Sequence, residues 1–371
     1  MKVLAALSGG VDSAVAAALA KEAGHDVTAV HMALSANQTQ NRCGSRGCCT
    51  VEDASDARLA ASMLEIPFYV WDMAETFEET VVEDFLNEYR RGRTPNPCVR
   101  CNEFVKFREL ATRADALGFD AVWTGHYARV LTGPGGVELH RAKCMEKDQS
   151  YVLAVMGREA LEKVIFPLGE YESKSQVRAE AERRGLPMSA KPDSYDICFI
   201  ADGDTRGFLR SRLGSKTGKI VDTEGAEVGT HSGAYQFTIG QRKGLNLGRP
   251  AADGRPRYVL GTDMKTNTVV AGASELLSVD GITATDVVLL TEPDDPALSG
   301  QVEVTLQYRA HGQQVPAKVH LEADGTLRAQ LLKPTRAVAS GQSLVVYAGD
   351  RAICEATIEE AFKQVKTDNP V

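Results

Sequence analysis

The 371-residue sequence predicts an α/β protein in which an N-terminal parallel sheet is followed by a small central domain and a C-terminal antiparallel β-barrel. Three observations support this prediction. Up to about residue 124, short apolar runs alternate with segments of helical periodicity, which is typical of parallel strands joined by helices. Residues 205–260 are rich in glycine, basic residues and turn signals. From about residue 280 onward, apolar and polar residues alternate strictly.

The N-terminal elements are assigned from the spacing of apolar residues and from glycine and proline breaks. Because strands and helices alternate, the strands should form a parallel sheet with helices on both faces. Ligands of such sheets bind beyond the carboxyl ends of the strands, where loops lead into helices. Strands are expected at residues 2–7, 27–32, 67–72 and 121–124, and helices at residues 13–23, 51–64, 74–89 and 102–117.

The C-terminal strands are recognised by their period of two residues. Several such strands in succession favour a small antiparallel barrel. We place the three domains at residues 1–204, 205–275 and 276–371. Three sets of residues are each expected to share one face, namely Val302, Val304, Leu306 and Tyr308, then Val315, Ala317, Val319 and Leu321, and finally Leu327, Ala329 and Leu331.

The net charge of −8 argues against a general nucleic-acid-binding protein, but the charge is unevenly distributed. Residues 206–257, which we call the basic segment, contain ten Lys or Arg residues and only four acidic ones. A basic segment on an acidic protein suits the local binding of a polyanion. A solvated surface rich in loops would have the same composition, so charge alone leaves both interpretations open.

No apolar stretch is long enough to span a bilayer, and the first residues lack the cleavage pattern of a signal peptide. We therefore expect a cytoplasmic protein without a membrane partner. In that reducing compartment, eight cysteines indicate metal binding or thiol chemistry rather than a disulfide framework. Cys144 and Cys354 are expected to be buried and inert, and no role is assigned to Cys43, Cys48 and Cys49.

The sharpest motif is SGGVDS at residues 8–13, between the first predicted strand and the first predicted helix. Its glycines allow the backbone to approach a ligand, and the free N–H groups of the helix start favour an anion. Ser8 and Ser13 add hydroxyl donors. Asp12 would repel a phosphate, so it is expected to hold Mg²⁺ or to orient the loop. The whole pattern predicts a phosphate site rather than a plain glycine turn.

A second motif, TPNPCVRCN at residues 94–102, places Cys98 and Cys101 near the start of a predicted helix, where a thiolate is stabilised. Cys198 also follows a proline turn. From the residues alone, three interpretations stay open. They are a zinc or iron–sulfur site, a redox pair of the thioredoxin kind, and sulfur transfer, in which one cysteine carries a persulfide and another resolves it.

The hexapeptide at residues 8–13 resembles the PP-loop of ATP pyrophosphatases, which cleave ATP between the α- and β-phosphates and adenylate an oxygen of their substrate. Taken together with residues 94–102, four further blocks make the sequence similar to the tRNA-specific 2-thiouridylases over nearly the whole chain. These blocks are TGHY at 124–127, KDQSY at 147–151, SYDICF at 194–199 and FTIGQR at 237–242.

The resemblance implies thiolation at C2 of the wobble uridine in tRNAs for Lys, Glu and Gln. ATP with Mg²⁺ would adenylate the uridine O2, and a persulfide on Cys198 would supply sulfur and displace AMP. Cys101 would be the nucleophile that releases the sulfur, which leaves a Cys101–Cys198 disulfide for reduction. In an alternative scheme, Cys98, Cys101 and Cys198 hold an iron–sulfur cluster. A persulfide donor protein, such as a cysteine desulfurase or a sulfur relay protein, is implied as a partner.

The resemblance also implies roles for individual residues. Asp12, Cys101 and Cys198 would be catalytic, and the basic segment would help to hold the tRNA. A core methionine at position 32 and a satisfied strand-end histidine at position 126 are the structural alternatives. ATP contacts are implied for Ala6, Leu7, Ser8, Gly9, Gly10, Val11, Asp12, Ser13, Met32 and Gly125, and tRNA contacts for His126, Lys147, Gln149, Tyr308, Arg309 and Gln342.

Two other functions compete with this one. A PP-loop enzyme that ligates or amidates a small metabolite would need a glutaminase domain or an amine site, and it would not need paired cysteines. A metal-stabilised RNA-binding module without catalysis would have no use for an ATP loop. Release of AMP and pyrophosphate, together with sulfur incorporation into tRNA, discriminates among the three.

Overall fold

The computed structural model describes residues 1–34, 51–191, 197–200, 202–247, 253–310 and 312–363. Its N-terminal part contains a five-stranded sheet in which every strand pairing is parallel, as predicted. The strand order is β3-β2-β1-β4-β7. The strands are β1 (Lys2–Ala6), β2 (Asp26–Ala33), β3 (Phe68–Asp72), β4 (Ala121–Trp123) and β7 (Val164–Ile165).

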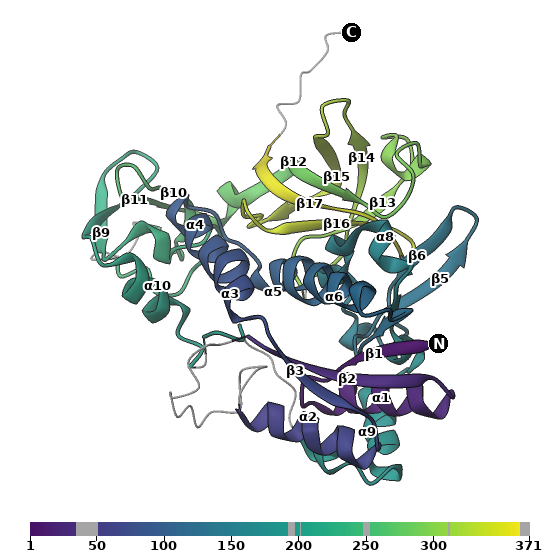
Figure 1. Ribbon diagram of the computed structural model, residues 1–371. Coiled ribbons are helices and arrows are strands. Elements are labelled where there is room, and N and C mark those ends of the chain that lie inside the picture. Colours follow the sequence, from purple (N-terminus) through teal and green to yellow (C-terminus); the bar gives the residue numbers. More distant parts are fainter. Residues whose placement is uncertain (35–50, 192–196, 201, 248–252, 311, 364–371) are drawn as a thin grey trace.

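Helices cover both faces of this sheet (Figure 1). On one face lie α1 (Val11–Glu22), α2 (Val51–Met63) and α9 (Lys174–Arg183). Alternation along β1 explains the two layers. Val3 and Ala5 enter the core beneath α1, whereas Leu4 enters a second core on the opposite face. A strand buried on both faces must be apolar where it is buried, and β1 is apolar from Val3 to Ala6 after the exposed Lys2.

Two long helices lie between the sheet and the C-terminal barrel (Figure 1). The second begins at Pro97 rather than near residue 102, because Pro97 at the first helical position and the Asn96 cap start it before the apolar periodicity does. The first is α3 (Ala74–Phe77), η1 (Glu78–Val82) and α4 (Glu83–Arg90) in succession, and the second is α5 (Pro97–Arg100), η2 (Cys101–Glu109) and α6 (Leu110–Ala116).

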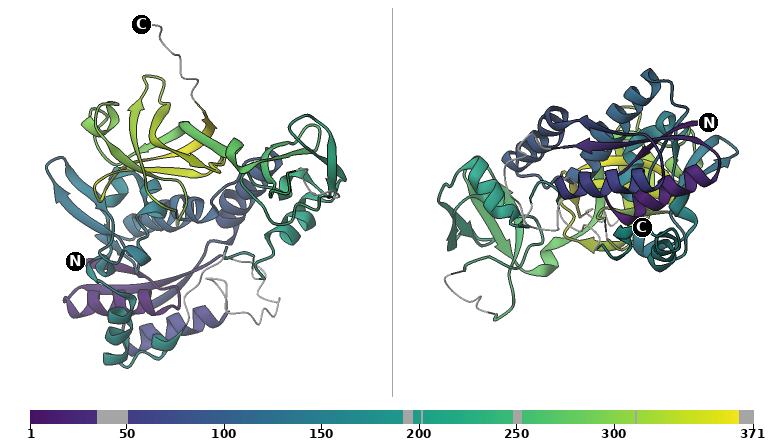
Figure 2. Two further views of the ribbon diagram at one scale, coloured as in Figure 1. Left: turned by 180° about the vertical axis from the view of Figure 1, so that it is seen from behind. Right: turned by 60° about the horizontal axis from the view of Figure 1, so that its bottom comes forward.

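The central part lies to one side of the molecule, next to α4 (Figure 1 and Figure 2). It has its own small core, centred on Ile220, Phe237 and Val259. Its four strands are arranged in the order β10-β11-β8-β9. The elements are α10 (Thr205–Leu213), β8 (Gly218–Val221), β9 (Glu227–His231), β10 (Tyr258–Asp263) and β11 (Thr268–Gly272).

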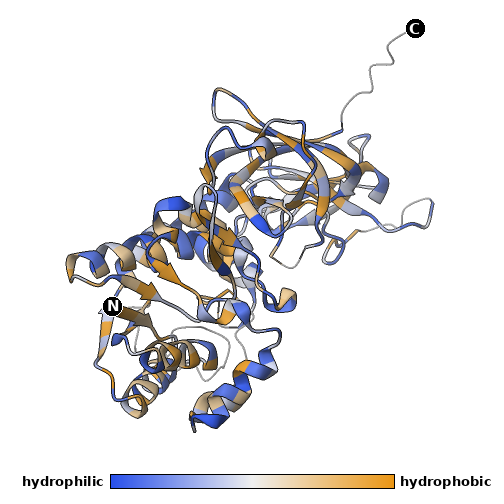
Figure 3. Cartoon of the chain, turned by 90° about the vertical axis from the view of Figure 1, so that its right-hand side faces the viewer, coloured by the Kyte–Doolittle hydropathy of each residue, from blue (hydrophilic) through white to orange (hydrophobic). Residues whose placement is uncertain are grey.

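The C-terminal part is the predicted antiparallel barrel, and a pairing between β12 and β17 closes it. Its interior is a buried apolar core, and Figure 3 shows apolar residues recurring along the strands. The residues that were predicted to share one face of each strand are buried or pack against this core, except Val302. Val302 is 41% exposed because the strand begins at Val304. The strands are β12 (Ser278–Leu289), β13 (Val304–Gln307), β14 (Val315–Leu321), β15 (Leu327–Arg336), β16 (Ser343–Ala348) and β17 (Arg351–Phe362).

A hairpin that the sequence patterns did not predict connects the N-terminal part to the barrel sheet. Its strands are β5 (Arg129–Gly133) and β6 (Gly136–His140), and His140 pairs with Arg351 of β17. The domain boundaries at residues 204 and 275 stay a prediction. Shorter elements are η3 (Met145–Lys147), α7 (Ser150–Leu153), η4 (Ala154–Met156), α8 (Gly157–Leu161), η5 (Pro167–Glu170), η6 (Pro187–Ala190), η7 (Ala234–Gln236), η8 (Ser274–Leu277) and η9 (Pro296–Leu298).

Within the described ranges, no helix combines the length and the apolar character needed to cross a bilayer.

Candidate functional site

The loop of residues 8–13 lies where the order of the parallel strands reverses. β1 leads into the loop, and its two neighbours, β2 and β4, start the two opposite arms of the sheet. The crevice beyond the carboxyl ends of β1 and β4 is therefore the topological switch point, where such sheets bind their ligands. The N-terminus of α1 opens onto the same crevice and presents the N–H groups of its first turn.

Two glycines of the predicted site are required by close backbone contacts. Gly9 has φ +79°, and a Cβ there would stand 2.3 Å from the carbonyl oxygen of Asp53 on α2. Gly125 follows β4, and a Cβ there would stand 2.6 Å from the backbone nitrogen of Ser13. Two residues predicted to contact ATP from distant parts of the chain, Gly125 and Ser13, are thus brought together.

The two serines brace the loop. The Ser13 hydroxyl accepts the N–H of Ser8 (3.1 Å) and donates to the carbonyl of Gly10 (3.0 Å). The two hydroxyl oxygens are 3.1 Å apart. The loop is therefore braced by its own side chains, which lowers the entropy cost of binding an anion.

Asp12 is held by two residues that sequence reasoning did not assign to the site. The Tyr127 hydroxyl donates to its Oδ1 (2.7 Å), and the Lys174 ammonium contacts its Oδ2 (2.5 Å). Tyr127 belongs to the TGHY block, so its position in that block was a signal. No motif in the sequence pointed to Lys174, which is the first residue of α9. It reaches Asp12 only because α9 packs against α1.

A second lysine pins the loop from the other side. The Lys191 ammonium donates to the Gly9 carbonyl (3.1 Å) and to Asp53 (2.8 Å) and Asp56 (2.6 Å) of α2. Burial disfavours its charge, but the two carboxylates outweigh that effect and raise the pKa of Lys191. Lys191 is therefore a fixed cation that joins α2 to the phosphate loop.

The remaining residues predicted to contact ATP lie at the ends of β1 and β2. Ala6 ends β1, and the Leu7 carbonyl accepts a hydrogen bond from Nδ1 of His31 (2.8 Å). Because a carbonyl can only accept, Nδ1 carries the hydrogen. Met32 is half-buried beside Trp71 of β3 and packs against two apolar cores. Its position fits both the core role and an apolar contact with adenine.

The cysteine motif starts the helix formed by α5, η2 and α6. The Asn96 side chain accepts the N–H of Cys98 (3.1 Å), and Cys98 itself is exposed. Cys101 lies one turn later and is only 4% exposed. Arg100, between the two cysteines, is paired with Asp84 and Glu103.

Cys101 and Cys198 contact the same apolar cluster. Cys101 is one of its buried members, and the half-buried Cys198 packs against it together with Phe199. Cys198 forms no disulfide. In the part of the chain that the structure describes, no three His, Cys, Asp or Glu side chains are grouped as a metal site. Cys43, Cys48 and Cys49 lie outside the described residues, and Cys144 and Cys354 are buried as predicted.

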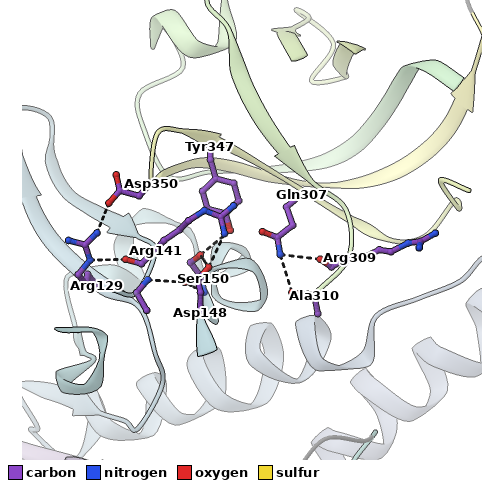
Figure 4. Close-up of polar contacts among 10 residues, drawn as sticks. Arg129, Arg141, Asp148, Ser150, Gln307, Arg309, Ala310, Tyr347 and Asp350 are labelled. Atoms are coloured by element: carbon purple, nitrogen blue, oxygen red, sulfur yellow. Dashed lines mark hydrogen bonds and ion pairs between the residues drawn. The ribbon is translucent and has the colours of Figure 1, made fainter. Parts of the chain in front are cut away.

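The KDQSY block is organised by a buried ion pair (Figure 4). The Asp148 carboxylate accepts a hydrogen bond from the Arg141 guanidinium (2.9 Å) and another from the Ser150 hydroxyl (2.8 Å). The guanidinium carbon of Arg141 lies 3.5 Å from the ring centre of Tyr347 on β16, and the Tyr347 hydroxyl is 3.0 Å from that of Ser150. The block is thus clamped between the parallel-sheet part and the barrel.

Two predicted tRNA contacts lie beside this block. Gln149 forms reciprocal hydrogen bonds with Tyr127, since its Oε1 accepts the Tyr127 N–H (2.9 Å) and its own N–H donates to the Tyr127 carbonyl (2.8 Å). The His126 ring packs near Phe107 and Phe166, with Nδ1 2.8 Å from the Thr124 hydroxyl. Burial, with a smaller effect of the nearby Lys106 charge, lowers the pKa of His126 to about 3. It is therefore neutral.

The other predicted tRNA contacts lie further apart. Tyr308 donates to or accepts from Thr335 (2.6 Å), and the exposed Arg309 donates to the carbonyl of Ala337 (2.5 Å). The Gln342 amide donates to the carbonyl of Thr94 (2.6 Å), which links the barrel to the cysteine loop. Lys147 ends η3 and is half-buried.

Two cations of the basic segment, Arg212 and Lys216, line a pocket at the central part. The described lysines and arginines of the basic segment are exposed except Arg257, and Arg249 lies outside the described residues. A pocket of about 480 Å³ opens there between α4, α10 and the central sheet, and Arg90, Arg212 and Lys216 supply cations to its wall. Such a cationic concavity attracts anions.

Comparison with known proteins gives matches along almost the whole chain. Residues 1–202 match the family model of the tRNA methyl transferase HUP domain, residues 206–273 that of the tRNA methyl transferase PRC-barrel domain, and residues 279–358 that of the aminomethyltransferase beta-barrel domain. Three relatives each bear the name tRNA-specific 2-thiouridylase MnmA. The protein of Beutenbergia cavernae is 61% identical over 96% of this chain and 94% of its own length. Those of Acidothermus cellulolyticus (57%; 96% and 97%) and Kocuria rhizophila (55%; 98% and 98%) are similarly close.

Proposed function

The chain belongs to the family of tRNA-specific 2-thiouridylases, and on that premise we propose that it places sulfur at C2 of the wobble uridine in tRNAs for Lys, Glu and Gln, with ATP as co-substrate. The observation that carries the proposal is the pairing of a phosphate loop at the sheet switch point with two cysteines, Cys101 and Cys198, that share one apolar cluster.

In the first half-reaction, the uridine O2 attacks the α-phosphorus of ATP. The bond from that phosphorus to the bridging oxygen breaks, and pyrophosphate leaves. A carbonyl oxygen is a poor leaving group, so its conversion to an adenylate makes C2 open to substitution. Positioning by the loop backbone and by the first turn of α1 supports this step, because catalysis of such transfers is largely orientation and charge stabilisation. Gly125 allows the end of β4 to lie directly against the backbone of the loop at Asp12 and Ser13.

Mg²⁺ would neutralise the polyphosphate charge and is expected beside Asp12. The carboxylate already accepts hydrogen bonds from Tyr127 and Lys174, but each carboxylate oxygen has a further lone pair, so the donor set fits a hard cation. Asp12 would hold the ion, while Tyr127 fixes the orientation of the carboxylate.

In the second half-reaction, the outer sulfur of a persulfide on Cys198 attacks C2, and AMP leaves. The Cys101 thiolate then attacks the sulfur of Cys198. The bond between the two persulfide sulfurs breaks, the tRNA keeps the outer sulfur, and a Cys101–Cys198 disulfide forms. An external dithiol returns both cysteines to thiols. The common cluster of the two residues supports this exchange.

An iron–sulfur cluster on Cys98, Cys101 and Cys198 receives no support from the geometry. Cys98 is exposed whereas Cys101 is buried, and the described residues contain no such three-ligand group. No step is therefore assigned to a cluster.

The tRNA would lie across all three parts. The cationic pocket beside Arg90, Arg212 and Lys216 supports binding of the phosphate backbone, and the link from Gln342 to Thr94 places the barrel next to the cysteine loop. The uridine would leave its stack to reach the crevice, as single-stranded loops allow. The persulfide would come from a cysteine desulfurase or a sulfur relay protein in the cytoplasm, where thiols stay reduced.

The test is incubation of the protein with ATP, a persulfide donor and unmodified tRNA. Thiolated tRNA is retarded on a mercury-containing gel, and AMP with pyrophosphate should be released rather than ADP. Sulfur-free tRNA together with ADP release would refute the proposal. AMP release with a small amine or carboxylate in place of tRNA would instead identify a ligase.

A further inference from the structure

The strand β3 forms one edge of the parallel sheet (Figure 1). In the described part of the chain, β3 pairs with β2 on one side and with no strand on the other. Tyr69 and Val70 of this strand are 57% and 46% exposed. An open edge invites pairing with another strand, and proteins usually guard it with a lysine, a proline or a bulge within the strand. The segment Phe68–Asp72 contains none of these.

Hydrogen bonding to β2 decides which backbone groups of β3 face outward. The carbonyl of Pro67 and the N–H of Met73 are both hydrogen-bonded to β2, at 2.7 and 2.9 Å. A strand uses alternate residues for each of its two sides, so the odd-numbered residues between these two also face β2. The even-numbered residues direct their N–H and C=O groups away from the sheet, and these are Phe68, Val70 and Asp72.

A second copy of the same strand matches this pattern. If two copies run antiparallel about a two-fold axis at Val70, each Val70 faces its counterpart and each Phe68 faces Asp72 of the partner subunit. Every outward N–H and C=O of the three residues then belongs to a hydrogen-bonded pair. Moving the axis to a neighbouring residue would set one of the three opposite a residue outside the strand. The edge is therefore self-complementary in one register.

The charges beside the edge suit the same register. Phe68 packs against the core beneath α2, and the guanidinium carbon of Arg58 on α2 lies 5.2 Å from the centre of the Phe68 ring. Asp72 lies four positions after Phe68, so its side chain emerges on the same face of the sheet. Pairing of Phe68 with the partner's Asp72 would thus bring each Arg58 beside a carboxylate of the other copy.

Both charges are available for this contact. Among the described residues, Arg58 contacts the Phe68 ring and belongs to no ion pair. The Asp72 carboxylate accepts the N–H of Ala74 (2.9 Å) and likewise belongs to no ion pair. The opposite face of the sheet is also complementary, because it would set the exposed Tyr69 against the partner's Trp71, and cross-strand aromatic pairs stabilise a sheet.

We propose that the open edge of β3 is a dimer interface, at which two copies of this chain pair antiparallel about Val70 and join their parallel sheets into one. The inference goes beyond the proposed function and does not depend on it. The phosphate loop follows β1, and β2 and β3 separate β1 from this edge, so each copy keeps its own loop.

The first experiment is sedimentation velocity of the full chain over a concentration series up to about 100 μM, where a complex of micromolar affinity is largely formed. The wild type should shift from monomer to dimer. Val70→Lys sets two ammonium groups opposite each other and should weaken association by roughly tenfold or more. Leu131→Lys is the matched control, because Leu131 is 37% exposed on β5, which is also an edge strand.

A charge swap tests the register. Arg58→Asp and Asp72→Arg should each weaken association by roughly tenfold, because each sets like charges together at two symmetric places. The double variant restores opposite charges and should return to within about threefold of the wild type, as expected for residues in contact. Lys333→Glu, at an exposed position of β15, is the control for a charge reversal elsewhere.

A wild type that stays monomeric over the whole series would overturn the inference and point instead to a strand of a different protein as the occupant of the edge. A dimer that Leu131→Lys dissociates while Val70→Lys does not would overturn it as well. A double variant that associates no better than the single ones, with its thermal unfolding midpoint unchanged, would refute the register.

Discussion

The Tyr127 hydroxyl donates a hydrogen bond of 2.7 Å to the carboxylate of Asp12, 115 positions earlier in the chain. The same tyrosine is joined to Gln149 by two hydrogen bonds through its backbone. The orientation of the loop carboxylate therefore depends on a residue at the end of a neighbouring strand and on the KDQSY block behind it. This connection leads to the first prediction.

Asp12→Ala should abolish AMP release, because it removes the expected Mg²⁺ ligand. Tyr127→Phe keeps the buried ring and removes only the hydroxyl, so AMP release should fall by roughly tenfold, the effect of one hydrogen bond to a charged group. The measurement is AMP formation at saturating tRNA. Tyr69→Phe, on a tyrosine that is 57% exposed, is the control and should match the wild type. An unaffected Tyr127→Phe enzyme would show that Asp12 is positioned without it.

Cys101→Ser and Cys198→Ser should each abolish thiolation while ATP binding persists, since each lacks one sulfur of the exchange. The mercury gel measures thiolation, and calorimetry measures ATP binding. Cys98→Ser should remain active because Cys98 is not needed for the two-thiol exchange. Cys144→Ser, at a buried thiol away from the motif, is expected to be nearly silent. A fully active Cys101→Ser or Cys198→Ser enzyme is the result that the paired-thiol mechanism cannot accommodate.

Glu355 on β17 gives the protein a pH-dependent stability. Burial raises the pKa of Glu355 to about 7, although the Ser343 hydrogen bond and the Arg100 charge oppose the shift. Because the folded-state pKa lies above the unfolded value of 4.5, the folded state binds more protons between them. The stability from this group is therefore full below pH 4.5 and is lost as the pH rises through about 7.

Glu355→Gln should accordingly gain stability over the wild type above pH 7, by as much as about 3 kcal/mol, and should show little gain near pH 5. Thermal unfolding midpoints at the two pH values provide the measurement. Glu360→Gln, on the same strand but exposed, is the control. Parallel pH profiles for Glu355→Gln and the wild type would contradict the assignment.

The Arg141–Asp148 pair should be costly to break from one side. Both side chains are at most 5% exposed, so Asp148→Ala leaves a buried guanidinium without its carboxylate and should lower stability by roughly 3–5 kcal/mol. The double change Arg141→Met with Asp148→Leu should recover part of this loss. Glu227→Ala, which breaks an exposed pair with Lys219 at 3.0 Å, should cost no more than about 1 kcal/mol. Similar losses for the buried and the exposed pair would refute the argument.

The local sequence was sufficient to predict the elements in which apolar residues recur at regular spacing. The strands before and after α1, the phosphate loop and the barrel strands from β13 to β15 are all found near their predicted positions. Each of these elements buries one or two of its faces, and the spacing of its apolar residues shows which faces these are. The start of the cysteine helix was missed because a cap and a proline, rather than periodicity, begin it.

By itself, the sequence determined the chemistry at hand: a glycine loop that accepts phosphate, thiols at residues 101 and 198, and an apolar pattern that requires a parallel sheet and a barrel. Only the tertiary structure decided which charges meet at the loop. Lys174 and Lys191 contact Asp12 and Asp53 across more than a hundred positions of chain, and the β5–β6 hairpin joins a barrel built from the other end. Such contacts depend on how helices pack on the sheet, and periodicity within one segment carries no information about the partner of another.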